Sequence, residues 1–132
     1  MNYLAFLKLD GIKGESNAAH HQGETKLLSV SWLNKRPVGL HTPPSETKEI
    51  CFLKELDTIS PILLKRYIDG DHIDSAVVTM AKSVGAASIP YLTITMTDVT
   101  ITSLIMLGYN SADKKHVEEF VLSCAKLEIK HS

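Results

Sequence analysis

Apolar and polar residues alternate along several stretches of the chain. This two-residue period predicts β-strands, because successive side chains of a strand point to opposite faces. Four such strands are expected in the first two thirds of the chain, over residues 3–10, 24–33, 48–56 and 74–82. The segment VGAAS, which follows the fourth strand, is typical of a turn.

In the second expected strand, the alternation separates an apolar face from a polar one. The face expected to lie against the core consists of Leu28, Val30 and Trp32. The opposite face is expected to lie in water because it carries two serines, and it consists of Leu27, Ser29 and Ser31.

The longest expected strand covers residues 90–105 and contains a change of phase. Its apolar side chains occupy even positions at first and odd positions later, and they are Leu92, Ile94, Met96, Val99 and Ile101. Alternation is strict in a regular strand, so this slip predicts a bulge or kink near Thr97-Asp98.

One helix is expected over residues 60–70. Ser60 has the side chain of an N-cap, Pro61 fits the first helical position, and Gly70 is expected to end the helix. Apolar residues at helical spacing give it a side that we expect to lie on the rest of the protein, formed by Leu63, Leu64, Tyr67 and Ile68.

The last apolar segment, residues 117–129, fits two interpretations. One set of apolar residues keeps helical spacing and consists of Val117, Phe120, Val121 and Cys124. Another alternates as in a strand with one slip and consists of Phe120, Leu122, Cys124, Leu127 and Ile129. The residues alone leave helix and strand open.

Two loops are expected to be exposed. The first, residues 11–23, carries Gly11 and Gly14, which permit backbone angles that a Cβ would forbid. A phosphate-binding loop is the alternative, but the spacing of a P-loop is missing. The second, residues 33–47, holds three prolines, of which Pro43-Pro44 favour a stiff, extended path. Long loops in compact domains are usually functional or disordered.

Composition and charge narrow the class of protein. A chain of 132 residues has the length of one domain, which we expect to span residues 1–132. Its net charge of −1 argues against nucleic acid or an anionic membrane as the main partner. No apolar run reaches the roughly 18 residues of a membrane span, and no signal peptide begins the chain. We therefore expect folding in the cytosol.

The cysteines and histidines do not indicate a metal site. Cys51 and Cys124 lie in apolar surroundings, and we expect free thiols because the cytosol keeps cysteine reduced. The six histidines lack ligand spacing apart from the pair His20-His21, and no CxxC occurs. Neither a metal nor another cofactor is expected.

Carboxylates cluster in sequence around the first loop, at Asp10, Glu15 and Glu24. Paired carboxylates perform acid–base chemistry when they face a cleft at set distances. The simpler interpretation is a solvated loop with ion pairs to Lys8 and Lys13. Since GxSxG and HExxH motifs are also missing, no catalytic residue and no enzyme activity are expected.

Five segments together extend over nearly the whole chain. They are FLKLDGIKGES (Phe6 to Ser16), HQGETKLLSVSW (His21 to Trp32), LDTISPILLKRYIDG (Leu56 to Gly70), YLTITMTDVTITS (Tyr91 to Ser103) and FVLSCAKLEI (Phe120 to Ile129). In this order they resemble the Hcp (haemolysin-coregulated protein) family, the tube subunits of bacterial type VI secretion. The chain departs from the family at residues 33–47, where the connection is often rich in glycine and serine.

The resemblance implies a mainly β fold, a compact β-barrel of two sheets with one short α-helix packed on the outside. It favours a strand for the last segment, because the family closes its barrel there. It also implies homohexameric rings that stack into a tube, with the type VI spike, sheath and effector proteins as partners. The protein would assemble in the bacterial cytoplasm and be exported to the medium or a target cell.

On this interpretation, the two exposed loops are the candidates for contacts between subunits and rings. Their candidate assembly residues are Gly11, Lys13, Gly14, Glu15, Arg36, Pro37, His41, Pro43 and Pro44. Ser29 and Ser31 are candidates for the lumen face that touches cargo, with plain solvent exposure as the alternative.

Two other functions stay open. One is an effector-binding adaptor or chaperone of the same family that builds no long tube, which the stacking of purified rings would distinguish. The other is a stand-alone ligand-binding barrel, for example for sugars. Such barrels usually offer aromatic platforms, and this chain has few aromatic residues to spare.

Overall fold

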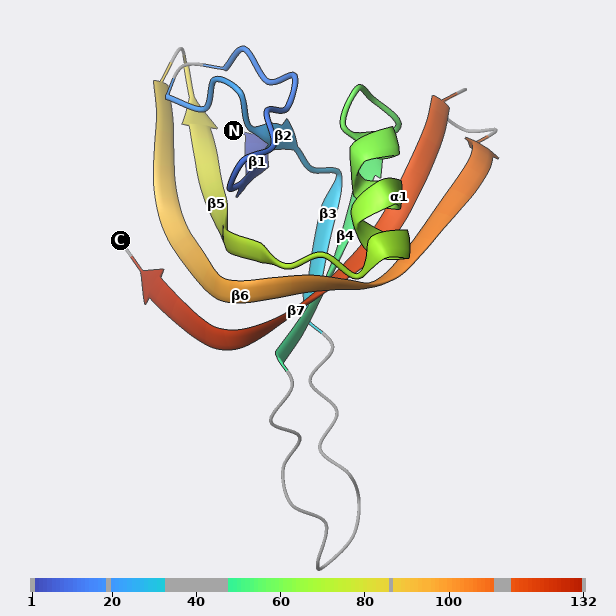
Figure 1. Cartoon of the computed structure of the whole chain (residues 1–132). Helices are drawn as coiled ribbons and strands as arrows, with labels where there is room; N and C mark the ends of the chain where they lie inside the picture. The colour runs from blue at the N-terminus through green and yellow to red at the C-terminus, as the bar shows by residue number, and fades with distance from the viewer. Residues whose placement is uncertain (1, 19, 33–47, 86, 111–114, 132) are drawn as a thin grey trace, which may run out of the picture.

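The computed structural model describes residues 2–18, 20–32, 48–85, 87–110 and 115–131. Seven strands and one helix occur in these ranges (Figure 1). They are β1 (Asn2–Leu9), β2 (Thr25–Lys26), β3 (Ser29–Trp32), β4 (Lys48–Glu55), α1 (Ser60–Asp69), β5 (Ile73–Val84), β6 (Ala87–Asn110) and β7 (Lys115–His131). The predicted strands at 3–10, 48–56 and 74–82 are therefore confirmed to within a few residues.

All seven strands belong to one antiparallel sheet in the order β2-β1-β5-β6-β7-β4-β3. Its two outermost strands, β2 and β3, are separated in sequence by two residues only. The Leu27 amide donates to the Ala5 carbonyl of β1 at 2.9 Å, and the Leu28 amide donates to the Leu53 carbonyl of β4 at 2.7 Å. The segment therefore crosses from one edge of the sheet to the other and closes a barrel.

The expected barrel with one short helix is confirmed, and the hydrogen bonding adds that the two expected sheets are continuous. Figure 1 shows β6 (gold to orange) as a strongly curved strand that passes through both halves of the barrel.

Asp98 lies at the bend of β6 with φ 55°, and the carboxylate oxygen of Asp98 lies 2.6 Å from His72 Nδ1. Buried residues switch from Ile94 and Met96 to Val99 and Ile101 across this point. The predicted kink near Thr97-Asp98 is thus confirmed.

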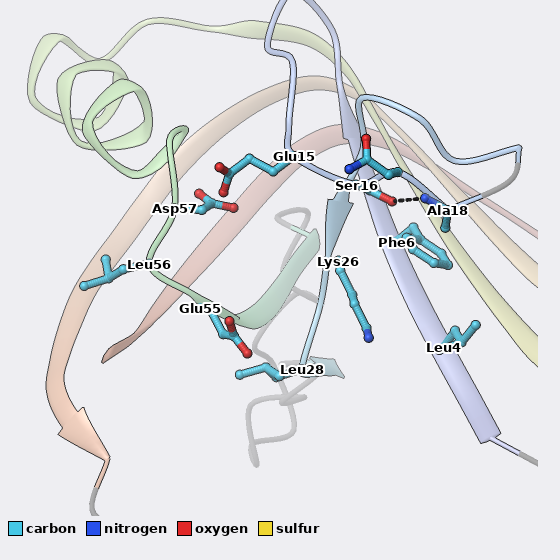
Figure 2. Close-up of a pocket in the computed structure, with 11 residues that line it drawn as sticks. Leu4, Phe6, Glu15, Ser16, Ala18, Lys26, Leu28, Glu55, Leu56 and Asp57 are labelled. Atoms are coloured by element: carbon cyan, nitrogen blue, oxygen red, sulfur yellow. Dashed lines mark hydrogen bonds between the residues drawn. The ribbon is translucent and has the colours of Figure 1, made fainter. Parts of the chain in front are cut away.

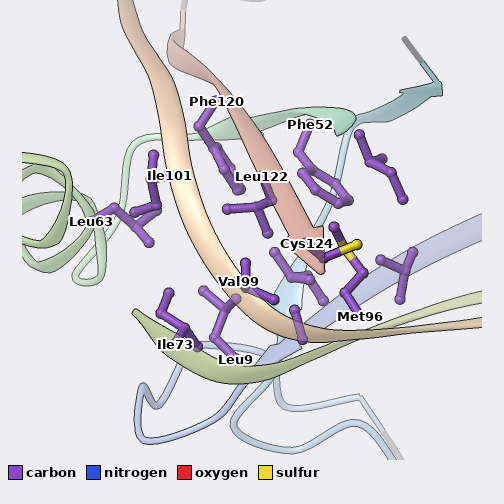
Figure 3. Packing of buried hydrophobic residues seen from close by; sticks show 14 of the residues in the cluster. Leu9, Phe52, Leu63, Ile73, Met96, Val99, Ile101, Phe120, Leu122 and Cys124 are labelled. Atoms are coloured by element: carbon purple, nitrogen blue, oxygen red, sulfur yellow. The ribbon is translucent and has the colours of Figure 1, made fainter. Parts of the chain in front are cut away.

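The core fills the inside of the curled sheet (Figure 3). Phe52 of β4 and Phe120 of β7 are paired in register and stack with ring centroids 5.2 Å apart. The remaining side chains of the cluster come mainly from β1, β5, β6, β7 and the helix region, and they include Leu7, Leu9, Ile59, Leu63, Ile73, Val78, Ile94, Met96, Val99, Ile101 and Leu122.

The predicted faces of the strand at 24–33 are wrong for its three other large apolar residues, although Val30 packs against the core as expected. Leu27, assigned to the wet side, is buried, whereas Leu28 and Trp32, assigned to the core, are 50% and 38% exposed. The reason is the crossing between two partner strands at residues 27 and 28, which interrupts the alternation that a single regular strand would keep. Ser29 and Ser31 are exposed as expected.

The helix is present but its predicted cap and apolar side need correction. The N-cap is Ile59, not Ser60, and no side chain caps the helix. Only Leu63 of the predicted apolar side is buried, while Leu64 is 36% and Ile68 is 71% exposed. A ten-residue helix that lies against the end of a barrel covers one narrow stripe, so the second apolar row stays in solvent. Gly70 ends the helix as predicted, with φ 69°.

The last segment forms a strand along its whole described length, β7 (Lys115–His131), as the resemblance indicated. It pairs with β6 throughout and with β4 over residues 117–124. Tertiary pairing on both sides therefore overrides the helical spacing of its first residues. Cys51 and Cys124 are both free thiols, as expected.

Candidate functional site

The first loop folds back on itself and is tightly hydrogen-bonded. Gly11 has φ 78°, a left-handed conformation that suits glycine. Gly14 has another role: a Cβ there would lie 2.5 Å from the Glu24 carbonyl oxygen. The Gly14 amide donates to the Gly23 carbonyl at 2.7 Å and the Ser16 amide to the Glu24 carbonyl at 2.9 Å. The glycines thus let two arms of the loop approach closely.

The charged residues of this loop do not form the ion pairs predicted for them. Glu24 contacts the Nδ1 atom of His21 at 3.2 Å, and the His21 ring stacks on Phe6 with centroids 4.2 Å apart. Glu15 accepts a long hydrogen bond, 3.4 Å, from the Thr58 amide before the helix. His21 therefore fastens the base of the loop to β1, and Glu15 reaches toward α1.

A cleft of about 560 Å³ lies under this loop (Figure 2). Its walls come from β1, the loop, the crossing strand and the end of β4, and it is lined by Leu4, Phe6, Glu15, Ser16, Asn17, Ala18, Lys26, Leu28, Glu55, Leu56 and Asp57. Glu15 and Asp57 lie at the upper end in Figure 2, and Leu4 and Leu28 at the lower end. The cleft thus combines carboxylates with apolar side chains.

Behind the cleft lies a buried ionic network that the sequence analysis missed. Lys54 of β4 and Glu118 of β7 are opposite each other in register, fully buried, and in contact through ammonium and carboxylate. The Lys54 ammonium also lies 2.8 Å from Asp57 Oδ1 and 3.1 Å from Ser60 Oγ. The Ser60 hydroxyl donates to Glu118 Oε1 at 2.8 Å. The network therefore ties the first residue of α1 to two strands of the barrel.

A sequence signal for this network existed. Lys54 has the same parity as the core residues Ile50 and Phe52, and Glu118 the same parity as Phe120. A lysine and a glutamate on core faces must be paired, because burial of a lone charge costs several kcal/mol or more. The pattern alone does not show that Lys54 and Glu118 are each other's partners, because that depends on the register between β4 and β7.

The candidate assembly residues divide into two groups. Lys13 and Glu15 are exposed on the first loop, where Gly11 and Gly14 shape the backbone. The others lie outside the described residues, and they are Arg36, Pro37, His41, Pro43 and Pro44.

The edges of the sheet are only partly covered. Beyond residue 124, β7 pairs only with β6 in the described part of the chain, and β3 pairs only with β4. Several large apolar side chains near these edges and on α1 are exposed, among them Trp32, Ile62, Tyr67, Ile68 and Ile129. Open edges with exposed apolar neighbours are sites where other chains bind.

The thiol of Cys51 contacts the carboxylate of Glu119. Burial, with a hydrogen bond to Glu119 Oε1 at 3.0 Å, raises the pKa of Cys51 to about 11. A thiol with such a pKa stays protonated at neutral pH and is a poor nucleophile or metal ligand. Within the described ranges, no three metal-ligating side chains come together.

The comparisons with known proteins agree on one family. The family model described as "Type VI secretion system effector, Hcp" matches residues 6–131. Protein hcp1 of Pseudomonas aeruginosa (strain PAO1) is 25% identical over 130 residues, which cover 94% of this chain and 80% of that protein.

Solved structures resemble the whole fold. The crystal structure of Hcp1 from Salmonella typhimurium has a TM-score of 0.83 and 28% identity, covering 100% of this chain and 87% of that one. A type VI secretion system effector from Yersinia pestis has a TM-score of 0.77 and 33% identity, covering 96% and 88%.

Proposed function

The chain belongs to the Hcp family, the tube subunits of type VI secretion systems, and from this premise we propose that six copies form a closed ring and that these rings stack. The family match over residues 6–131 is the observation that carries the proposal. The unit that assembles would be the single domain of residues 1–132. Its partners would be its own copies, the type VI spike, the sheath and effector proteins.

The free edges of the barrel support assembly. Among the described residues, β3 has no strand on its outer side and the last residues of β7 pair with β6 alone, so both expose backbone donors and acceptors that a neighbouring subunit would satisfy. Closed cyclic symmetry satisfies such edges without unlimited growth within a ring. Ser29 and Ser31 on β3 are exposed and polar, which suits a wall in contact with cargo. Stacking would use the first loop and residues 33–47.

The protein would serve as a structural subunit and not as an enzyme. Asp10, Glu15 and Glu24 do not form a facing pair, because Glu24 binds His21 and Glu15 points to the Thr58 amide. Replacing all three should change stability or assembly only. Substrate turnover that disappears with these carboxylates would contradict this assignment.

Assembly would take place in the bacterial cytoplasm, followed by export to the medium or a target cell through the secretion apparatus. The helix within the described residues, α1, is too short to cross a membrane.

Native mass spectrometry of the purified protein tests the ring. A mass of six chains supports it, and a monodisperse monomer at high concentration contradicts it. Electron microscopy of the same sample then separates the tube subunit from an adaptor of the same family, since stacked particles favour the tube and single rings favour the adaptor.

A further inference from the structure

The cleft under the first loop has the size of a small-molecule site. Its volume of about 560 Å³ lies within the range of ligand pockets in proteins, roughly 300–1,000 Å³. Part of its lining is apolar and is formed by Leu4, Leu28 and Leu56. Because Leu28 is half exposed, a ligand in the cleft would remove apolar surface from water, which is favourable.

Two carboxylates from separate elements line the upper end of the cleft. Glu15 comes from the first loop and Asp57 from the segment between β4 and α1, and Figure 2 shows both at this end. The Thr58 amide, which directly follows Asp57, donates to Glu15 Oε2 at 3.4 Å, so the two acidic residues are held close together. Lys26 also lines the cleft, but its ammonium points toward the lower end in Figure 2. A cation between the two carboxylates would relieve their repulsion.

The buried ionic network does not neutralise this pair. The Lys54 ammonium is shared between the carboxylates of Asp57 and Glu118. One ammonium therefore stands against three carboxylates, those of Glu15, Asp57 and Glu118, which leaves a net charge of −2 at this end of the cleft. Glu55 has an interaction of its own and is left out of this count.

Both carboxylates keep a part that a ligand can reach. Asp57 receives the Lys54 ammonium at 2.8 Å and the Ile59 amide at 3.1 Å, and both contacts use its Oδ1 atom. The Asp57 side chain is still 16% exposed, and Glu15 is exposed on the loop. A donor group in the cleft can therefore bind to both side chains.

The lining favours an organic cation over a metal ion. A calcium ion takes roughly six to eight oxygen ligands, and no three metal-ligating side chains come together in the described ranges. A planar amidinium or guanidinium donates parallel hydrogen bonds to carboxylates. The apolar body attached to such a group would then lie between the leucine side chains of the cleft.

We propose that the cleft binds a small organic cation. Its amidinium, guanidinium or ammonium group donates to Glu15 and Asp57, and its apolar body lies against Leu28 and Leu56. This binding site goes beyond the tube function, and the ring is not needed for it.

Benzamidine is the probe for this site, and benzamide, which has a similar shape without the charge, is the matched control. Saturation-transfer difference NMR detects weak binding to particles of any size. Benzamidine should bind to the wild-type chain in the millimolar range or more tightly, and at least about tenfold more tightly than benzamide. No binding of benzamidine, or equal binding of the two probes, would overturn the proposal. This comparison needs no variant, so it is independent of any folding defect.

Two substitutions then locate the probe. Glu15→Gln should weaken benzamidine binding at least about tenfold, because it removes one of the two carboxylates. Leu28→Ala should weaken the binding of benzamidine by about threefold through lost apolar contact. Asp71→Asn is the matched control, since Asp71 is exposed and does not line the cleft, and it should leave binding unchanged. Benzamidine binding that does not respond to Glu15→Gln in a folded variant would place the probe elsewhere and overturn the cleft site.

The ring is tested separately, by the mass of the native particle. Rings without benzamidine binding would overturn the cleft site and leave the tube subunit intact. Binding to a chain that stays monomeric would support the cleft site and contradict the ring.

Discussion

Single residues in this barrel act mainly through constraint. Gly11 is needed for its φ of 78° and has open space around it, whereas Gly14 is needed because the Glu24 carbonyl lies where its Cβ would be. Lys54 and Glu118 are needed as a pair, because either charge alone would be buried without its opposite. Each of these roles predicts its own response to substitution.

Gly14→Ala should therefore cost more stability than Gly11→Ala. At Gly11 the penalty is that of a left-handed residue with a Cβ, about 1 kcal/mol, and a β-branched residue should cost more. At Gly14 a clash with backbone atoms places the cost near the upper end for overpacking, about 3 kcal/mol. Urea unfolding measures both, and Gly85→Ala, with φ 60° and open space, should match Gly11→Ala. Equal losses at 11 and 14 would contradict the assignment.

Removing one member of the buried pair should destabilise strongly. Glu118→Leu leaves the Lys54 ammonium with Asp57 alone and should cost about 3–5 kcal/mol. Lys54→Met combined with Glu118→Leu should recover most of that loss, because a well-packed apolar pair replaces two desolvated charges. Urea unfolding at pH 7 gives all three values. A double variant as unstable as Glu118→Leu would show that the network has a role beyond charge compensation.

The thiol of Cys51 should respond to pH in a defined direction. The folded pKa of Cys51, about 11, lies above the ordinary thiol value of 9.0. The protonated thiol therefore contributes stability that is present below pH 9 and is lost as the pH rises through 11. Alkylation by iodoacetamide should be slow at pH 8 and rise steeply with pH. Glu119→Gln should move the profile to lower pH, and the urea-unfolded chain provides the reference rate. An ordinary thiol profile in the folded protein would contradict the raised pKa.

At the scale of elements, attachment of α1 depends on few contacts. Leu63 enters the core, Ile59 is buried just before the helix, and Ser60 joins the ionic network. The Ile59 amide is satisfied by Asp57 Oδ1 at 3.1 Å, so Asp57 links the helix start to Lys54. The helix is thus held at its N-terminal half, and its other apolar side chains stay exposed.

Leu63→Ala should lower the unfolding free energy by about 2–5 kcal/mol, as expected for a large-to-small change in a packed core. Leu64→Ala, one position away on the exposed side, is the matched control and should cost less than about 0.5 kcal/mol. Denaturant titrations of both variants decide the point. A larger loss of stability for Leu64→Ala would mean that the exposed apolar side of α1 is covered by another subunit in the assembled state. In that case, dilution to monomers should abolish the loss.

The whole molecule is a barrel whose closing strand changes partners and whose edges stay partly open. Residues 33–47 connect β3 to β4, at an edge where β3 lacks an outer neighbour in the described part of the chain. A connection at that position is well placed to act between subunits, while the barrel itself depends on other contacts.

Deletion of residues 37–45 should therefore leave the barrel folded and weaken assembly. Circular dichroism and the urea midpoint should stay near those of the intact chain, and native mass spectrometry or light scattering should show loss of stacking or of ring closure. Unfolding of the deletion variant would contradict the independence of the barrel. Unchanged stacking would remove these residues from the assembly contacts.

The sequence by itself determined the strands over residues 3–10, 48–56, 74–82 and 90–105, the kink at Asp98, the end of the helix at Gly70 and, through resemblance, the family and the last strand. These follow from local rules: side-chain alternation, turn residues and motifs that survive in order along the chain. A clear alternation of apolar and polar residues identifies a strand without any information about the neighbouring strands.

Only the tertiary structure decided which faces are buried where partners change. Leu27 is in the core and Leu28 outside because one segment closes the barrel by crossing between β1 and β4, and Leu64 is exposed because α1 lies on the barrel along a narrow stripe. The pairing of Lys54 with Glu118, and the cleft with its excess of carboxylates, join residues far apart in sequence. Such contacts depend on strand register, and register is set by the packing of the whole sheet.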